Sequence, residues 1–361
     1  MKPIAIYLPQ FHPIPENDEW WGKGFTEWTN VTKAKPLFKN HYQPHLPADL
    51  GFIDLRLAES RQAQVDLAKT YGIEGFCYYH YWFKGKKLLD RPFEDVLKTG
   101  QPDFPFCLFW ANETWSRRWL GEEKEVLLKQ EYSEDDDIKH AHYLLNAFKD
   151  KRYITVNGRP VFVIYKPNDL PNPAATVNTI KRIAIQHIGI EPLLIASNSH
   201  FTDAAKLFSF GFDEILNFRP QLGVLPNAFN TTISVKRFIN NCISNRTLNG
   251  NLKIFDYGKA LHLMSEVEPA DFDNIIPMVF VGWDNSARRG NKGIIITNNT
   301  PEKFADEIIR VVDKMDNSKN NNGLLFINAW NEWAEGNHLE PDHKNGLAYL
   351  KVIKQVNEKF K

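Results

Sequence analysis

The chain has 361 residues and carries 44 Lys and Arg against 44 Asp and Glu, so its formal net charge is zero. This balance argues against nucleic acid or an anionic membrane as the main partner, because both attract an excess of basic side chains. No apolar run reaches the length of a membrane-spanning helix and no signal-peptide pattern opens the chain. These features indicate a cytoplasmic protein, or a periplasmic one if a signal peptide has been removed.

Short apolar runs alternate along the chain with amphipathic segments. The runs predict strands at 4–9, 75–81, 105–110, 161–166, 192–197, 214–218, 276–283 and 324–330. Apolar residues at helical spacing predict helices between them, among others over Leu55–Ala68, Ile138–Phe148, Val177–Ala184 and Phe304–Met315. Eight such units predict an α/β protein in which residues 1–361 form one (β/α)₈ TIM-barrel domain. A doubly wound open sheet is the alternative.

Two connections between the predicted strands are long. Residues 10–53, after the first strand, carry no helical period and are rich in Pro, Trp, Asn and His. Residues 219–275 predict a helical insertion between strands six and seven, with helix-like pieces near 235–243 and 254–267. Ordered long loops on a compact domain are usually functional. The first loop either packs a small core of its own or lines a groove with Trp20, Trp21 and Trp28.

The sequence carries no recognisable metal-binding pattern. The cysteines match no metal-ligand spacing, so we expect reduced thiols, buried where they lie in apolar runs, at Cys77, Cys107 and Cys242. The first loop holds histidines for which we expect structural roles, namely His12, His41 and His45. D-x-D strings, with which sugar-nucleotide enzymes often hold a metal, occur at 135–137 and 271–273, but no glycine-rich phosphate loop follows the first strand. We therefore expect no metal and no other cofactor.

Polar and aromatic residues follow nearly every predicted strand. In a barrel the active site lies at the carboxyl ends of the strands, so we expect these residues to line one sugar-binding groove. The residues expected to bind substrate are Tyr7, Gln10, His80, Trp82, Trp110, Asn112, Glu113, Tyr165, Trp283, Asp284, Asn331 and Trp333. His80 is expected to bind a sugar hydroxyl, and Glu113 to support the site by holding an Arg or Asn side chain. Arg288 is expected to pair with Glu113 or Asp284.

The segment NAWNEWAEGNHLEPD, residues 328–342, follows the last predicted strand and contains Glu332 and Glu335. If the chain turns helically there, the two side chains share a face, with Cβ atoms roughly 5–6 Å apart. Paired carboxylates beside flat rings such as Trp330 and Trp333 suit glycoside chemistry, in which one acid protonates the leaving oxygen. Such close carboxyl groups favour retention, since inverting enzymes need roughly 6.5–9.5 Å between them. The alternative is that Glu332 and Glu335 only mark the start of a helix, where acidic side chains are stabilised by the positive end of the helix dipole.

Taken together, five segments resemble the WbsX-type proteins, a branch related to glycoside hydrolase family 99, the endo-α-mannosidase family. They are IAIYLPQFHPIPENDEWWGKGFTEWTNV, GFCYYHYWF, FPFCLFWANETWSRRW, GWDNSARR and FINAWNEWAEGNHLEPD. The resemblance runs from the first residues to about Leu350. It implies a (β/α)₈ barrel and a place in bacterial surface-polysaccharide loci, where such proteins are commonly labelled glycosyltransferases.

In the endo-mannosidase relatives the last motif resembles NEWHEG and both glutamates are catalytic; they match Glu332 and Glu335, with Ala334 in place of the histidine. The resemblance implies that Glu332 takes a proton from the sugar 2-hydroxyl, which attacks its own anomeric carbon. Glu335 protonates the leaving oxygen and then activates water. The change at Ala334 argues against carrying over α-mannose as the substrate.

We therefore expect a retaining glycoside hydrolase or transglycosylase that acts without a metal on a bacterial surface or dietary polysaccharide. One alternative is a glycosyltransferase of O-antigen or capsule assembly that uses an activated sugar donor. The other is a non-catalytic glycan-binding barrel, which would not require two acids at this spacing.

Overall fold

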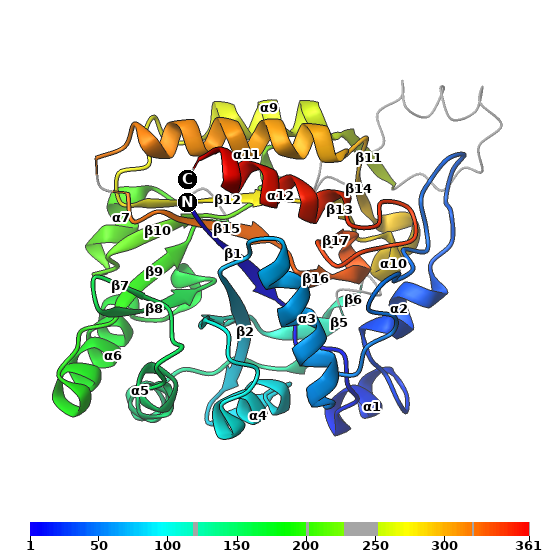
Figure 1. The fold of residues 1–361 in the computed structure, drawn as a ribbon. Coiled ribbons are helices and arrows are strands. Elements are labelled where there is room, and N and C mark those ends of the chain that lie inside the picture. The colour runs from blue at the N-terminus through cyan, green and yellow to red at the C-terminus, as the bar shows by residue number, and fades with distance from the viewer. Residues whose placement is uncertain (118–121, 200–201, 227–251, 320, 361) are drawn as a thin grey trace.

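The computed structural model describes residues 1–117, 122–199, 202–226, 252–319 and 321–360 (Figure 1). The predicted helical piece at 235–243 and Cys242 lie outside the described residues. Cys77 and Cys107 are buried and free, as the sequence predicted.

Eight parallel strands form a closed barrel. In order around it they are β1 (Lys2–Tyr7), β2 (Gly75–Phe83), β4 (Phe106–Trp110), β8 (Arg159–Ile164), β9 (Leu193–Ser197), β10 (Glu214–Asn217), β12 (Ile275–Phe280) and β15 (Leu324–Asn328). Closure comes from β15, which pairs with β1 from Lys2↔Leu324 to Ala5↔Ile327, while β1 also pairs with β2. The protein is a (β/α)₈ TIM barrel, which excludes the open doubly wound sheet. Each predicted strand overlaps one of these eight.

Helices follow the barrel strands and form the outer layer (Figure 1). They are α3 (Ala58–Thr70), α4 (Arg91–Thr99), α5 (Glu134–Phe148), α6 (Pro173–Ile188), α7 (Ala204–Ser209), α9 (Tyr257–Glu266), α11 (Pro301–Asp316) and α12 (Ala348–Lys359). Ser133 and Thr300 begin α5 and α11 by accepting hydrogen bonds from the backbone N–H groups of Asp136 and Lys303. The four predicted helical stretches overlap α3, α5, α6 and α11.

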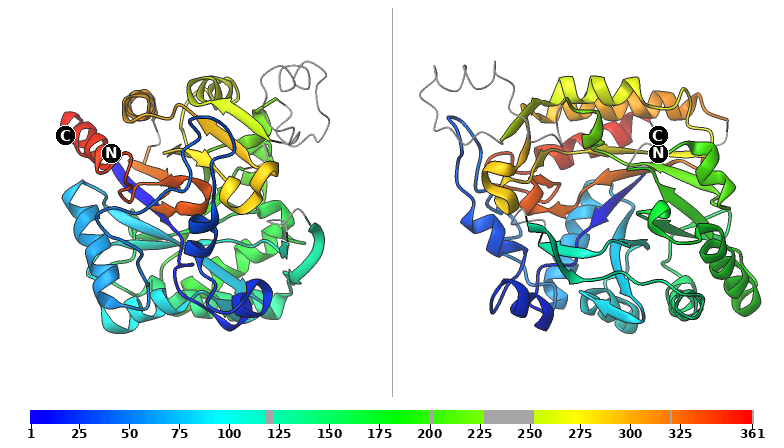
Figure 2. Two further views of the ribbon diagram at one scale, coloured as in Figure 1. Left: turned by 90° about the vertical axis from the view of Figure 1, so that its right-hand side faces the viewer. Right: turned by 180° about the vertical axis from the view of Figure 1, so that it is seen from behind.

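The long loop after β1 contains two helices that the sequence did not predict, α1 (Pro15–Trp21) and α2 (Glu27–Lys33). Each has 7 residues, too few for a hydrophobic period to emerge. The local signals were Pro15 at the start of α1 and the capping box that begins α2. The left view of Figure 2 shows this loop, in blue, running across one end of the barrel. Trp28 packs inward, with its ring 4.9 Å from that of Phe11.

The connection between β10 and β12 contains, in its described part, η3 (Leu222–Val224), β11 (Lys253–Asp256) and then α9. The prediction of a helical piece from 254 was wrong at its start, because 254–256 form a strand and α9 begins only after Asp256 caps it. β11 pairs with β14 (Ile294–Thr297), and β14 pairs with β13 (Trp283–Asp284), which forms a small second sheet.

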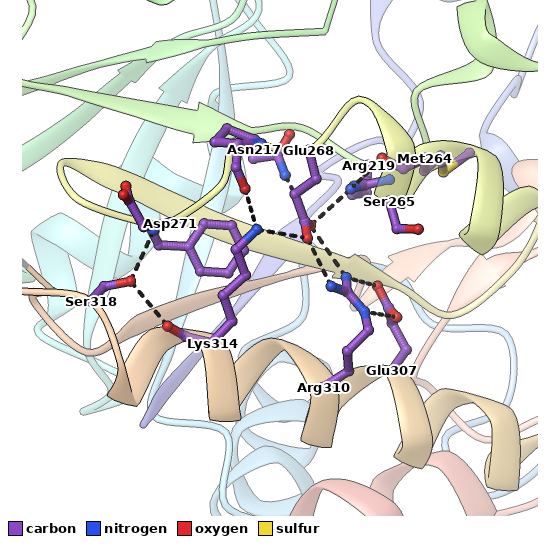
Figure 3. A network of polar contacts seen from close by, with 12 residues as sticks. Asn217, Arg219, Met264, Ser265, Glu268, Asp271, Glu307, Arg310, Lys314 and Ser318 are labelled. Atoms are coloured by element: carbon purple, nitrogen blue, oxygen red, sulfur yellow. Dashed lines mark hydrogen bonds and ion pairs between the residues drawn. The ribbon is translucent and has the colours of Figure 1, made fainter.

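An ion-pair network attaches this connection to the barrel (Figure 3). The carboxylate of Glu268, just after α9, lies 2.9 Å from Arg219, 2.8 Å from Arg310 and 3.2 Å from Lys314. Arg219 follows β10, while Arg310 and Lys314 belong to α11. Because Glu268 and Arg219 are almost fully buried, the network fixes where β10 ends relative to the outer helices.

Candidate active site

A short hairpin carries the two candidate acids. Glu332 ends β16 (Asn331–Glu332), which pairs with β17 (Asn337–His338), and Glu335 ends the intervening 3-10 turn η5 (Trp333–Glu335). Gly336 closes the turn with φ of 57°, and a Cβ there would lie 3.0 Å from the Cβ of Asp284. The turn therefore requires glycine at this position. Both acids line a cavity of about 240 Å³ at the carboxyl ends of the barrel strands.

One guanidinium group joins both acids to the first loop. Arg288, in α10 (Ser286–Arg289), places Nη1 2.5 Å from Glu335 Oε1 and Nη2 3.1 Å from Glu332 Oε2. The same Nη2 lies 2.5 Å from Oε1 of Glu27, at the start of α2. Glu27 Oε1 also accepts a hydrogen bond from the backbone N–H of Ala334, between the two acids. The sequence did not indicate this grouping, because its members lie far apart in the chain.

Burial and mutual repulsion shift the proton affinity of the pair. Burial raises the pKa of Glu332 well above its usual range, and the nearby Glu335 raises it further, while Arg288 opposes both effects. Burial also raises the pKa of Glu335, which Arg288 opposes and the carboxylates of Glu27 and Glu113 reinforce. Like charges that are close and buried favour one shared proton, which is the state that acid–base catalysis needs.

The walls of the cavity combine aromatic rings with polar side chains. Its described lining includes Trp21, Tyr79, Tyr81, Trp115, Tyr165 and Trp283. Gln10 Nε2, Asn328 Oδ1 and Trp283 Nε1 are buried and have no hydrogen-bond partner within the part of the chain that the structure describes. Rings with polar side chains between them match the alternating apolar faces and hydroxyl groups of a sugar.

The structure brings some of the predicted site residues together at this cavity and places others elsewhere. Beside Glu332 and Glu335, the cavity is lined by Gln10, Glu113, Tyr165 and Trp283. Glu113 also forms an ion pair of 2.5 Å with Lys166. The predicted residues that do not line the cavity are Tyr7, His80, Trp82, Trp110, Asn112, Asp284, Asn331 and Trp333.

Four of these face the outer helices. The Tyr7 hydroxyl donates to Gln64 in α3, and Trp82 Nε1 donates to Asp136 in α5. His80 lies 2.9 Å from His140 of α5, and burial lowers its pKa to about 3. Trp110 packs edge-on against His140 at 4.5 Å. Because successive strand residues point to opposite faces, their neighbours Leu8, Tyr79, Tyr81 and Ala111 line the cavity instead.

Three of the other four hold the loops in place. Asn331 exchanges two hydrogen bonds with the backbone of Leu8, and Asn112 does the same with Lys166. Asp284 accepts from Gln43 at 2.8 Å and lies 2.7 Å from His41.

The two tryptophans beside the acids do not offer their faces to the cavity. Trp333 is buried, stacks on His338 at 3.8 Å and donates to Glu340. Trp330 is fully buried in the core.

The tryptophans of the first loop and the aspartates of the two D-x-D strings also have defined contacts. Trp21 lines the cavity, whereas the ring of Trp20 packs edge-on against Trp115 at 5.7 Å. In the D-x-D strings, Asp136 and Asp137 bind Trp82 and Thr176. Asp273 accepts from the backbone N–H of Lys319.

The chain matches a known protein family over nearly its whole length. The family model described as "Glycosyltransferase WbsX" matches residues 3–353. The chain belongs to the WbsX family. The WxcX proteins of two Xanthomonas campestris pv. campestris strains, B100 and ATCC 33913, are called uncharacterized and are 39% identical to this member over 354 residues, 98% of the chain. That match covers 49% of each relative, so the chain spans about half their length.

Solved structures share the fold of this WbsX-family protein. An endo-α-mannosidase of glycoside hydrolase family 99 from Bacteroides thetaiotaomicron matches with a TM-score of 0.56, 14% identity, and coverage of 99% of this chain and 97% of that one. A protein described as glycoside hydrolase-like matches with a TM-score of 0.58, 14% identity, and coverage of 98% and 93%. In the described residues of the WbsX-family chain, none of the helices combines the length and apolar character that crossing a membrane demands.

Proposed function

We propose that this protein is a retaining glycoside hydrolase or transglycosylase that acts on a bacterial surface or dietary polysaccharide. The observation that carries the proposal is the placement of Glu332 and Glu335 on one wall of an aromatic cavity, both bound to Arg288. The aromatic rings and the uncharged polar side chains of Gln10 and Asn328 that line the same cavity suit a neutral ligand rich in hydroxyl groups.

The proposed reaction has two steps. In the first, Glu332 removes the proton of the sugar 2-hydroxyl, O2 forms a bond to C1, and the glycosidic oxygen leaves with the proton of Glu335. In the second, Glu335 takes a proton from water or an acceptor hydroxyl, whose oxygen bonds to C1 while the C1–O2 bond breaks and O2 regains its proton from Glu332. Two displacements at C1 give net retention.

These roles need Glu332 ionised while Glu335 is protonated. The pKa of both carboxyl groups is raised, and the rise at Glu332 by itself opposes this assignment. Part of that rise comes from the Glu335 charge, however, and it vanishes when Glu335 carries the proton. Arg288 then stabilises the remaining Glu332 anion at 3.1 Å.

The alternative is a glycosyltransferase that uses an activated sugar donor, which the family description favours. A sugar nucleotide carries a diphosphate, whose binding calls for unengaged cations or a metal. Among the described residues that line the cavity, Arg288 is the one basic side chain, and it already contacts three carboxylates. This charge distribution favours a neutral glycan over a diphosphate donor.

A digestion screen tests the proposal. Purified protein is incubated with capsular, O-antigen and dietary polysaccharides, and new reducing ends and the anomer released first are followed by NMR. Retained configuration and very poor turnover of a 2-deoxy substrate support the mechanism. Inversion, or full-rate cleavage of the 2-deoxy substrate, overturns it. Transfer that depends on a sugar nucleotide, with no glycosidase or transglycosylase activity, establishes the alternative. Tight glycan binding without any turnover establishes a binding barrel.

A further inference from the structure

Three potential metal ligands converge behind the hairpin that carries the acids. His45 comes from the first long loop, His338 from β17, and Asp342 from the segment that follows. His45 Nδ1 lies 2.9 Å from His338 Nε2, and Asp342 Oδ2 lies 4.0 Å and 3.9 Å from these two atoms. Their side chains are 12%, 5% and 2% exposed, so the cluster is shielded from water. The sequence concealed it because 293 residues separate the histidines.

The surroundings orient the ligand atoms toward one another. His338 Nδ1 lies 2.9 Å from the backbone oxygen of Glu340, which makes Nδ1 the protonated nitrogen and leaves a lone pair on Nε2, facing the cluster. The ring is further held by stacking on Trp333 at 3.8 Å. Asp342 Oδ1 accepts from the backbone N–H groups of Lys344 and Asn345, which fixes the carboxylate and turns Oδ2 toward the histidines.

We propose that His45, His338 and Asp342 bind a divalent transition-metal ion, and that Zn²⁺ is the ion that this set of two imidazoles and one carboxylate suits. Zinc–ligand bonds of about 2.0–2.2 Å in tetrahedral geometry place neighbouring ligand atoms roughly 3.3–3.5 Å apart. The distances of 2.9, 3.9 and 4.0 Å lie on both sides of that value, so side-chain shifts of about half an ångström complete the site. A fourth position remains for water or a neighbouring side chain.

A hydrogen-bonded histidine pair without a metal is the competing explanation. In that arrangement His45 Nδ1–H donates to His338 Nε2 at 2.9 Å. Asp342 Oδ2 then lies 3.9–4.0 Å from both nitrogens, beyond hydrogen-bond distance, and accepts a long hydrogen bond of 3.3 Å from Asn345 Nδ2. A cation at the centre of the three atoms removes that misfit.

The position indicates what the ion does. None of the three ligands lines the catalytic cavity, so the ion lies outside the reaction site. His45 nevertheless packs on the residue that follows Glu335, since a Cβ on Gly336 would lie 3.3 Å from His45 Cε1. The ion therefore joins the first loop to the catalytic hairpin and restrains the turn that positions Glu335.

Metal binding is tested on protein without a polyhistidine tag, dialysed against EDTA and then into chelator-free buffer. Titration with Zn²⁺ by calorimetry, and metal analysis after gel filtration, should give one equivalent. Tm should rise by roughly 3–4 °C at a hundredfold excess over the dissociation constant. Titration with Co²⁺ should give the visible absorption of a four-coordinate site with nitrogen and oxygen ligands. Less than stoichiometric binding of both ions overturns the proposal without reference to any variant.

Variants then locate the ion. His338→Gln and Asp342→Asn keep the size of the side chain and should abolish the Zn²⁺-dependent rise in Tm, while unfolding near the wild-type temperature in EDTA. His343→Ala is the matched control, because His343 is adjacent in sequence but exposed and outside the cluster. It should bind zinc like the wild type. Undiminished zinc binding by a folded His338→Gln or Asp342→Asn protein places the ion elsewhere and refutes the assignment.

Discussion

Glu27 and Arg288 form a buried ion pair of 2.5 Å although 261 residues separate them in the chain. Arg288 continues from there to both candidate acids, and Glu27 continues to the backbone N–H of Ala334. The first loop is therefore part of the frame that holds the candidate active site, which gives α2 a structural role that its own sequence does not reveal.

Replacing Glu335 by glutamine should remove the proton donor and little else. We expect turnover to fall by about 10³-fold or more, because the general acid catalysis assigned to Glu335 is lost. The free energy of unfolding should stay within about 1 kcal/mol of wild type, since the substitution also relieves repulsion with Glu332 and Glu27. Steady-state kinetics and urea denaturation measure the two effects. An unfolded variant, or one with full activity, contradicts the assignment.

Glu27→Gln should change both stability and rate. The amide oxygen still accepts from Ala334, but Arg288 loses the charge of one of its carboxylates, so we expect unfolding free energy to fall by about 1–3 kcal/mol. Turnover should fall as well, because Arg288, which contacts both candidate acids, is held less firmly. Glu358→Gln, at an exposed position on α12, is the control and should leave both quantities unchanged. A Glu27 variant indistinguishable from that control argues against the frame.

Arg288 should set the pH at which the enzyme works. It opposes the raised pKa of both Glu332 and Glu335, so its removal in Arg288→Gln lets both pKa values rise further. Ionisation of Glu332 sets the acidic limb of the activity profile and deprotonation of Glu335 sets the basic limb. Both limbs should therefore move to higher pH. Arg288→Lys keeps the positive charge and should show the smaller shift. The profile of kcat/KM against pH provides the measurement, and a shift to lower pH speaks against the roles proposed.

Glu340 should make the protein less stable as the pH approaches neutrality. Burial raises its pKa to about 7, whereas an unfolded glutamate titrates near about 4.3. The folded state therefore binds a proton that the unfolded state has released, and this contribution is complete below about pH 4.3 and lost as the pH rises to about 7. The loss is about 1.4 kcal/mol per pH unit in that window. Glu340→Gln should flatten the dependence of unfolding free energy on pH. An unchanged slope would contradict this expectation.

Two tyrosines on neighbouring strands test which face of the barrel wall contacts substrate. Tyr81 lines the cavity, whereas the Tyr7 hydroxyl donates to Gln64 under α3. Tyr81→Phe should raise KM or lower kcat several-fold with little change in stability. Tyr7→Phe should cost about 1 kcal/mol of stability and leave kcat/KM unchanged. The reverse pattern would mean that the substrate lies somewhere other than this cavity.

The sequence predicted the barrel well because each strand is a short apolar run and the helices between them keep a clear period. It also directed attention to Glu332, Glu335 and the strand ends. It could not decide which of two alternating strand residues faces inward, since both faces of a parallel barrel strand are buried. The sequence therefore indicated His80 and Trp82 as substrate-binding residues, whereas Tyr79 and Tyr81 line the cavity. The inward-facing positions of Gln10 and Tyr165 do not reveal which residues of β2 face the cavity. That depends on how β2 pairs with its neighbouring strands β1 and β4.

The grouping of Glu27, Arg288 and Ala334 was beyond sequence reasoning for a different reason. It depends on how a loop near the beginning of the chain lies over a hairpin that follows the last strand, and no local period records that contact. Conversely, Trp333 met every local criterion for a sugar platform, yet its ring is taken up by His338 and Glu340.

The pairing of β15 with β1 affects when, during folding, the candidate active site can form. The frame of the candidate active site joins residue 27 to residues 288–335, so we expect it to assemble late in folding, when the ends of the sheet meet. Contacts of such long sequence separation form late, because loop closure must precede them. During refolding, helical signal should return before turnover does, and the delay between the two would report the closing of the barrel.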